Sequence, residues 1–433
     1  MYELLFVCIL NYCNLGNGNI FVFNNLNLFF RDYKKGSILI LLLMPFLTMI
    51  YFGGQNIGLF LGLIVFIRWM FFSYSKWKIM SSSCFLGPIL ILGFSYIISN
   101  YYGISSHFPS AISNTIQLFL VFVLVDYLVR FPNLKEYALR IIIIMATILS
   151  INGFIETITH FNPLLNLSLV SGLYSEDTRI ITEIRFGLKR AQSAFGMHTS
   201  WGGYAFIVCC FLLYLKKYCN ITFKYANYLI ILLGMNIFFT GARSAFLGFA
   251  IALLAFVDVK DLKSKKIWGL ILFVIAISPL FIGYFEDIVS SFTDTEKVNG
   301  SNADMRQTQF DICFYYLSQS PWIGNGIAFT WEYVLPQNKD LLGAESLWIP
   351  VLIDQGILGA VAVSSMFVAC MIYLIKHNAM RYTTVVLGFL VFNSMSSIPN
   401  ISITDFVYYV ILLCMFIPNK KYKYETTTKR ITK

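Results

Sequence analysis

Apolar segments of about 16–20 residues recur along almost the whole chain, and they restrict it to a membrane-embedded fold. A helix needs roughly 20 apolar residues to cross about 30 Å of hydrocarbon. The chain is 58% hydrophobic and only 12% charged, whereas soluble proteins carry about 25% charged residues. The apolar runs are continuous rather than alternating, which argues against a β-barrel. We therefore predict an all-α polytopic membrane helix bundle.

Twelve apolar segments are the predicted spans, and they form one transmembrane domain over residues 37–418. A segment over 1–36 precedes this domain, and a basic tail over 419–433 follows it. Two long loops, over 159–196 and 286–350, interrupt the series of spans. The predicted spans cover approximately residues 37–53, 55–73, 83–100, 113–130, 140–158, 197–215, 225–240, 243–258, 267–285, 356–375, 382–398 and 402–418.

The start of the chain does not fit the same pattern. Residues 1–30 are apolar but carry seven asparagines between Asn11 and Asn27. An additional span, an interfacial helix and a re-entrant segment are all compatible with this composition.

Basic residues fall on every second gap between the apolar segments, and this alternation predicts the topology. Twenty-two of the 32 basic residues lie in these gaps. Positive charge near membrane ends is retained on the cytoplasmic side. We therefore expect cytoplasmic N- and C-termini and two external loops, 159–196 and 286–350. The basic gaps contain Lys34 and Lys35; Lys76 and Lys78; Arg130, Lys135 and Arg140; Lys216, Lys217 and Lys224; Lys260, Lys263, Lys265 and Lys266; Lys376 and Arg381; and the tail from Lys420.

Charge, cysteine and histidine patterns exclude several other classes of function. The net charge of +10 is explained by the cytoplasmic flanks, and no basic stripe interleaves with aromatic residues, so we expect no nucleic-acid partner. Nine cysteines form no CxxC pair, and four histidines show neither HxxxH nor HExxH spacing. We therefore predict neither a metal site nor a cofactor.

Arg243 is the last residue of a turn over 240–243 and begins an apolar span near the predicted external boundary. Cations are disfavoured at helix N-termini, because that end carries partial positive charge. An anion bound by the free N–H groups there would resolve the conflict. The alternative is an arginine that snorkels to lipid headgroups.

Three further arginines lie in the external loops. Arg306 begins a predicted helix inside an otherwise acidic loop, where Asp304 or Asp311 is the alternative surface partner. Arg185 and Arg190 flank Lys189 shortly before a glycine-rich entry to the next span. The alternative for this group is a basic cluster that touches anionic lipid.

The second external loop has an ordered middle and ends in a carboxylate. The predicted helix over 304–316 would place Phe310, Cys313, Phe314 and Leu317 on one face, and a tight turn follows at 324–326. Glu345 and Ser346 then open a short apolar helix before Gly356. The alternatives for Glu345 are a simple helix cap and a general base at the floor of an external cavity.

Together these residues predict a phosphate-binding site. Guanidinium groups bind phosphate oxygens bidentately, so several arginines on one side of a bundle form a plausible clamp. A nearby carboxylate or histidine would deprotonate a hydroxyl. The external loops carry no convincing DxD pattern. Arginine rather than magnesium would then stabilise a phosphate leaving group.

Four segments resemble motifs of the O-antigen ligase/O-antigen polymerase superfamily. Arg190 to His198 is similar to the family's Arg-x-x-G/S-x-F-x-x-P/H region, and Thr240 to Ala245 is similar to its Thr-Gly-x-Arg turn. The third segment is Arg306 followed by the Pro-x-x-Gly-x-Gly pattern of 321–326, and the fourth is the Glu-Ser-x-x…Gly-x-x-Gly pattern of 344–359. The resemblance covers roughly residues 185–360.

The resemblance implies a metal-independent glycosyltransferase of the bacterial inner membrane. Such an enzyme moves a glycan from an undecaprenyl-diphosphate carrier to an acceptor on the external leaflet, in polysaccharide or lipopolysaccharide biosynthesis. By resemblance, Arg243 and Arg306 bind the donor diphosphate, and Arg190 or Arg185 binds a second phosphate or a sugar acid. Glu345 or His198 is the base, with inversion at the anomeric centre. Ser346 and Trp322 are further predicted substrate-binding residues.

The family contains polymerases and ligases, and the sequence favours a polymerase. Glu345-Ser346 stands where the ligase branch resembles His-Asn/Ser-x-Tyr. The alternatives are an O-antigen ligase that transfers polymer to a lipid A core, and a lipid-linked oligosaccharide flippase. The expected partners are the undecaprenyl-diphosphate-linked glycan, the lipid bilayer and, as a further candidate, a chain-length regulator. Trp201, Trp322, Trp331 and Tyr333 are candidates for stacking on sugar rings.

Overall fold

The computed structural model describes residues 33–396 with eleven gaps, at 48–50, 53–54, 74–76, 78, 81–82, 106, 171–182, 186–187, 219–224, 258–302 and 339–342. The predicted spans over 267–285 and 402–418 lie outside the described residues. The ambiguous N-terminal residues and the basic tail lie outside them as well.

Helices make up most of the described chain, which confirms the all-α prediction. The main helices are α3 (Tyr33–Leu47), α4 (Ile57–Phe72), α6 (Leu86–Tyr102), α7 (Phe108–Arg130), α8 (Pro132–Thr159), α9 (Pro163–Val170), α10 (His198–Tyr218), α11 (Ala226–Phe239), α12 (Arg243–Leu253), α16 (Ala303–Gln319), α17 (Leu335–Gln337), α18 (Trp348–Lys376) and α19 (Thr383–Ser394). Short helical turns are η1 (Leu254–Phe256), η3 (Thr330–Val334) and η4 (Met380–Tyr382). Two antiparallel hairpins complete the description: β1 (Tyr51–Phe52) with β2 (Gln55–Asn56), and β3 (Ile184–Arg185) with β4 (Leu188–Lys189).

Three described helices are long and apolar enough to cross a membrane, namely those over Asn133–Thr159, His198–Tyr218 and Trp348–Lys376. Shorter apolar helices cover Phe60–Phe72, Leu86–Tyr102, Asn114–Leu128, Ala226–Phe239 and Arg243–Phe256. Ten of the twelve predicted segments coincide with described helices. The chain is thus a helical membrane protein, and the count of twelve spans stays a prediction.

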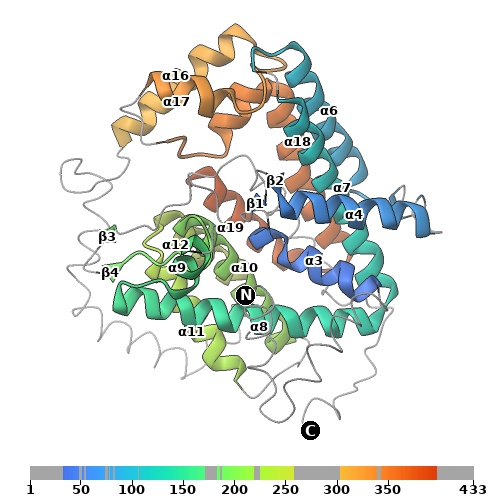
Figure 1. Cartoon of the computed structure of the whole chain (residues 1–433), viewed down its shortest axis with the longest axis vertical. Coiled ribbons are helices and arrows are strands. Elements are labelled where there is room, and N and C mark those ends of the chain that lie inside the picture. Colours follow the sequence, from blue (N-terminus) through green and yellow to red (C-terminus); the bar gives the residue numbers. More distant parts are fainter. Residues whose placement is uncertain are drawn as a thin grey trace.

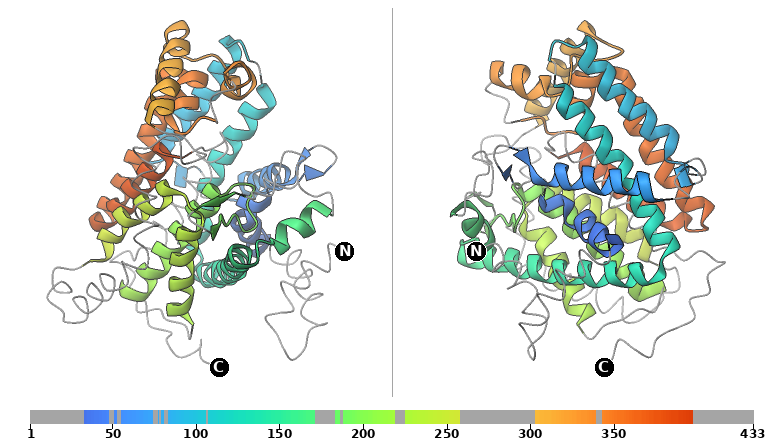
Figure 2. Two further views of the ribbon diagram at one scale, coloured as in Figure 1. Left: turned by 90° about the vertical axis from the view of Figure 1, so that its left-hand side faces the viewer. Right: turned by 45° about the vertical axis from the view of Figure 1, so that its right-hand side comes forward.

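The helices form two groups that meet at α19 (Figure 1). In one group α6 packs against α7 and α18, and in the other α10 packs against α11 and α12. Helix α19 lies along α12 and also contacts α18. Helices α3 and α4 pack together and lie against α8 and α7, while α16 packs on α18 at the far end of the molecule (Figures 1 and 2).

Polar contacts connect three of the inter-span segments that the charge pattern assigns to the cytoplasmic face. Lys217 Nζ donates to the carbonyl of Phe256 at 2.6 Å, and the Tyr218 hydroxyl donates to the carbonyl of Ala255 at 3.3 Å. Arg381 donates to the same Tyr218 hydroxyl. Segments that end near 218, 256 and 381 therefore meet at one end of this helix group, which we call the η4 end.

Helix α18 is broken at Gly356, and a turn from the preceding loop repairs the break. Gly356 has φ 65° and ψ −160°, which is not helical. The N–H groups of Ile357 and Leu358 donate instead to the carbonyls of Pro321 at 2.9 Å and Trp322 at 3.0 Å. Carbonyl groups of the turn after α16 thereby replace the acceptors within α18 that the N–H groups after the kink cannot reach.

The predicted turn at 324–326 is present, and its hydrogen bonds connect three elements. Gly324 and Gly326 have positive φ values of 72° and 107°. The N–H of Gly326 donates to the carbonyl of Asp354, and the carbonyl of Asn325 accepts from the N–H of Ser105, both at 3.0 Å. The loop after α6, the turn after α16 and the kink of α18 therefore form one fixed unit.

Candidate functional site

Arg306 and Glu345 lie together between α16 and the start of α18. Arg306 Nη2 is 3.5 Å from Glu345 Oε2, and their side chains are 30% and 20% exposed. Charge-assisted hydrogen bonds are usually about 2.7–2.9 Å long, so this pair is loose. Of the two predicted alternative partners, Asp311 accepts from Gln307 Nε2 at 3.0 Å, and the side chain of Asp304 lies outside the described part of the chain.

Gln309 holds Glu345 in place, and this role was not predicted from the sequence. Its Oε1 accepts from the N–H of Glu345 at 3.2 Å, and its Nε2 donates to the carbonyl of Gly343 at 2.6 Å. The side chain is buried. The available signal was its spacing: Gln309 lies three residues after Arg306, on the same helix face.

The Ser346 side chain binds the backbone at the start of α18. Its buried Oγ accepts from the N–H of Trp348, the first residue of α18, at 3.2 Å. Glu345 instead faces Arg306. The substrate-binding role of Ser346 stays a prediction. Its hydroxyl oxygen already accepts one hydrogen bond at the helix start.

The end of α19 connects the start of α18 to the start of α12. The N–H of Leu347 donates to the carbonyl of Asn393 at 2.9 Å, and Trp348 Nε1 donates to Ser394 Oγ at 2.9 Å. On the other side, the hydroxyls of Ser244 and Ser396 are 2.6 Å apart. We call these contacts the α12–α18–α19 junction.

Arg243 lies at this junction. It is the first residue of α12, it is half-buried, and it directly precedes Ser244. Glu345 lies two residues before Leu347 on the other side of the junction. Contacts with the end of α19 therefore link the start of α12, which carries Arg243, to the start of α18, which follows Glu345.

Arg190 is buried and is held by protein groups. Its Nε donates to the carbonyl of Thr240 at 2.9 Å, and its Nη1 lies 2.7 Å from Glu183 Oε2. Its side chain is only 5% exposed, so the alternative of a lipid-touching cluster is wrong for this residue. Arg190 braces the turn that carries Arg243, and its binding role stays a prediction.

The remaining predicted residues occupy separate positions. Arg185 lies in β3 opposite Leu188, and its side chain lies outside the described part of the chain. His198 is the first residue of α10 and is half-buried. Trp322 is 70% exposed at the turn after α16.

Trp201 is not available for sugar stacking, which corrects the prediction. It is fully buried and packs against Phe195 and Tyr204, with ring centroids 5.8 Å apart in both pairs. Tyr333 is 40% exposed and stacks on Phe329 at 5.0 Å.

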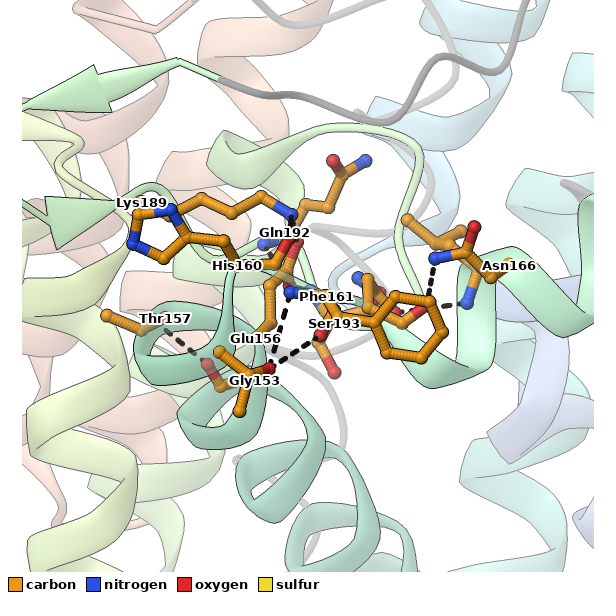
Figure 3. A network of polar contacts seen from close by, with 12 residues as sticks. Gly153, Glu156, Thr157, His160, Phe161, Asn166, Lys189, Gln192 and Ser193 are labelled. Carbon is orange, nitrogen blue, oxygen red and sulfur yellow. Dashed lines mark hydrogen bonds and ion pairs between the residues drawn. The ribbon is translucent and has the colours of Figure 1, made fainter.

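A buried polar network surrounds the loop segment 189–193 (Figure 3). Lys189 Nζ is 3.3 Å from Glu156 Oε1 near the end of α8. Glu156 Oε2 accepts from the N–H groups of Gln192 at 3.0 Å and Ser193 at 2.8 Å. This pair was not predicted from the sequence, because 33 residues separate its members.

Comparison with known protein families gives one match. Residues 228–364 match the family model of O-antigen ligase. The matched region begins in α11, includes Arg243, Arg306 and Glu345, and ends within α18. It covers about a third of the chain and confirms the resemblance to the O-antigen ligase/polymerase superfamily. No curated protein matches the chain.

Within the described ranges, no three histidine, cysteine, aspartate or glutamate side chains are grouped to hold a metal ion.

Proposed function

We propose that this protein is an inner-membrane glycosyltransferase that joins undecaprenyl-diphosphate-linked oligosaccharide repeat units into an O-antigen, capsular or exopolysaccharide on the external face. The family match over 228–364 supports the superfamily. The observation that carries the proposal is the 3.5 Å approach of Arg306 to Glu345, at a junction that also bears Arg243. A cation and a carboxylate side by side provide a phosphate ligand and a proton acceptor in one place.

In the proposed mechanism, Arg243 and Arg306 bind the diphosphate of the donor, whose charge they balance without a metal ion. Glu345 accepts the proton of a sugar hydroxyl on the acceptor. The hydroxyl oxygen then attacks the anomeric carbon in line, the bond to the diphosphate oxygen breaks, and undecaprenyl diphosphate leaves. The configuration at the anomeric carbon inverts.

The other predicted residues have supporting roles in this proposal. Arg185 binds a second phosphate or a sugar acid, whereas Arg190 is assigned to the internal brace because its guanidinium is buried. His198 is the alternative base. Trp322 is the best candidate to stack on a sugar ring, because it is 70% exposed. A chain-length regulator is a proposed partner.

The match to the O-antigen ligase family makes transfer of polymer to a lipid A core the second candidate. The flippase alternative is less well supported. A flippase needs charges that line a path at mid-membrane depth. Asp126 instead accepts from Trp69 Nε1 at 2.7 Å and Ser73 Oγ at 2.9 Å near the ends of α4 and α7.

The test is transfer by the purified protein in liposomes that contain the lipid-linked repeat unit. Arg306→Ala should lower the rate by about 10²–10³, the usual effect of losing one group that stabilises transition-state charge. Glu345→Gln should lower it by about 10²–10⁴, the usual contribution of a general base. Asp311→Asn is the matched control on α16, because Asp311 is exposed and bonds only Gln307 among the contacts described for its side chain. Polymer of wild-type length from both site variants would refute the proposal.

Deletion of the gene separates the two enzyme candidates. Gel analysis of surface glycan should show single repeats capped on lipid A if the protein is a polymerase. Long chains that remain bound to the carrier would identify a ligase.

A further inference from the structure

Glu156 is a buried carboxylate in an unfavourable place. It lies in the last turn of α8, which ends at Thr159, and its side chain has no exposed surface. The C-terminal end of a helix carries partial negative charge, so a carboxylate there is destabilised unless other groups compensate it. The compensating groups all come from the segment 189–193.

That segment supplies three contacts to one carboxylate. Lys189 Nζ lies 3.3 Å from Oε1 and also donates to the carbonyl of His160 at 3.1 Å, just after α8. The N–H groups of Gln192 and Ser193 donate to Oε2. Figure 3 shows Lys189, Gln192 and Ser193 arranged around Glu156.

Ser193 shows how firmly the segment is fixed. Its φ of 51° is a left-handed conformation that a serine adopts only when its surroundings hold it. Its Oγ donates to the carbonyl of Leu149 at 2.8 Å, and its carbonyl accepts from Asn162 Nδ2 at 2.6 Å. With the N–H bound by Glu156, every polar group of Ser193 is bound.

The opposite side of the same segment is bound to the turn before α12. The N–H of Ala191 donates to the carbonyl of Phe239, and Arg190 Nε donates to the carbonyl of Thr240, both at 2.9 Å. Thr240 is three residues before Arg243. The segment 189–193 is thus a strut between the end of α8 and the turn that carries Arg243.

We propose that Glu156, together with Lys189, is a positioning residue for Arg243: the buried pair fixes the strut, and the strut sets the 240–243 turn. Neither side chain needs to touch substrate, because both are at least 97% buried. The inference rests on the proposed function only for the role of Arg243 in binding diphosphate.

Hydrogen–deuterium exchange tests the strut without any substrate. Glu156→Ala should speed exchange about tenfold or more at the amides of 191–193 and at 240–243. Glu136→Gln is the matched control, because Glu136 pairs with Arg140 at the other end of α8 where both side chains are more than half exposed. Faster exchange confined to 191–193, with 240–243 unchanged, would overturn the proposal.

A double variant separates charge from shape. Glu156→Gln retains a carbonyl oxygen for the two N–H groups but leaves Lys189 buried without a counterion. Adding Lys189→Met removes that charge, so exchange at 240–243 should return toward the wild-type rate. If the double variant exchanges as fast as Glu156→Gln alone, the ion pair does not set the turn.

Transfer activity in liposomes is measured for a double-mutant cycle that combines Glu156→Ala with Arg243→Lys. Glu156→Ala should raise the KM for the lipid-linked donor about tenfold, and it should add little to the defect of Arg243→Lys, because both act on the same group. Fully additive defects would contradict positioning. A wild-type protein without transfer activity would instead refute the proposed function, and the exchange experiment would still decide the role of Glu156.

Discussion

Arg306 and Glu156 represent two kinds of charged residue in this protein, and they should differ in what they contribute to stability. Arg306 is 30% exposed, and its pair with Glu345 is 3.5 Å long. Such pairs contribute about 0–1 kcal/mol. Glu156 is fully buried, and breaking a buried pair costs about 3–5 kcal/mol. The loss of Arg306 should therefore affect chemistry far more than folding.

Thermal unfolding of the detergent-solubilised protein checks this difference. Arg306→Ala should change the free energy of unfolding by less than about 1 kcal/mol, whereas Glu156→Ala should lower it by about 3–5 kcal/mol. Arg140→Ala serves as a control for an exposed pair. If Arg306→Ala destabilises as much as Glu156→Ala, the Arg306–Glu345 contact is structural.

Cys313 gives a residue-level test of how α16 packs. Burial, followed by the nearby charge of Asp354, raises the pKa of this thiol from 9.0 to about 12. The thiolate is the reactive form. N-ethylmaleimide at pH 8 should leave the Cys313 peptide unlabelled in the folded protein and label it after denaturation. The folded state keeps the proton to higher pH, so its contribution to stability is full below pH 9 and is lost as pH rises toward 12. Rapid labelling of Cys313 at pH 8 without denaturation would show that α16 is not packed in this way.

At the scale of elements, the kink of α18 depends on a glycine. A Cβ at Gly356 would lie 2.7 Å from Gly324 N and from the carbonyl carbon of Trp322, and its φ of 65° disfavours other residues. Gly356→Ala should therefore destabilise the protein by roughly 1–3 kcal/mol from backbone strain alone. Gly234→Ala is the control, because a Cβ there meets nothing within 4 Å. A helical alanine in open space should be neutral or stabilise by up to about 1 kcal/mol. Equal melting temperatures for the two variants would contradict the role of the kink.

The elements also show what the sequence can and cannot predict. The helix over 304–316 and the turn at 324–326 were predicted from periodicity and glycines, and both are present. Burial varies across the predicted face, because Cys313 is fully buried whereas Phe314 is 57% exposed. Periodicity identifies a helix, but a helix in a loop has no membrane to fix which side is covered. Tertiary packing decides that, because Cys313 is buried in a cluster with Ile349 at the start of α18 and with Phe329.

The predicted helix boundaries were wrong where a predicted span was ended at charged residues. Helix α8 begins at Pro132, eight residues before the predicted start at 140. Proline fits the first turn of a helix, and Glu136 bonds Arg140 one turn later at 2.6 Å. The basic gap is thus helical. The partner of Lys189 was beyond prediction for a different reason, since a contact between residues 33 positions apart follows from packing rather than local pattern.

Across the whole molecule, the η4 end and the α12–α18–α19 junction lie at opposite ends of α12 and α19. Residues Phe256 and Tyr382 contact each other at one end, and Ser244 and Ser396 contact each other at the other. The charge pattern assigns the η4 end to the cytoplasm. A site that works on lipid-linked glycans outside the cell then requires Arg243, Arg306 and Glu345 to face outward.

Cysteine accessibility tests this orientation with an impermeant maleimide. Gln307→Cys and Lys216→Cys are suitable, because both side chains are exposed and they lie on α16 and at the C-terminal end of α10. In spheroplasts, with the protein without the added cysteine as the background control, Gln307→Cys should be labelled at once, and Lys216→Cys only after the membrane is opened. Labelling of both without opening would mean that the two ends do not face opposite sides. Labelling of Lys216→Cys alone would reverse the topology, and external lipid-linked glycan could then no longer reach the arginines.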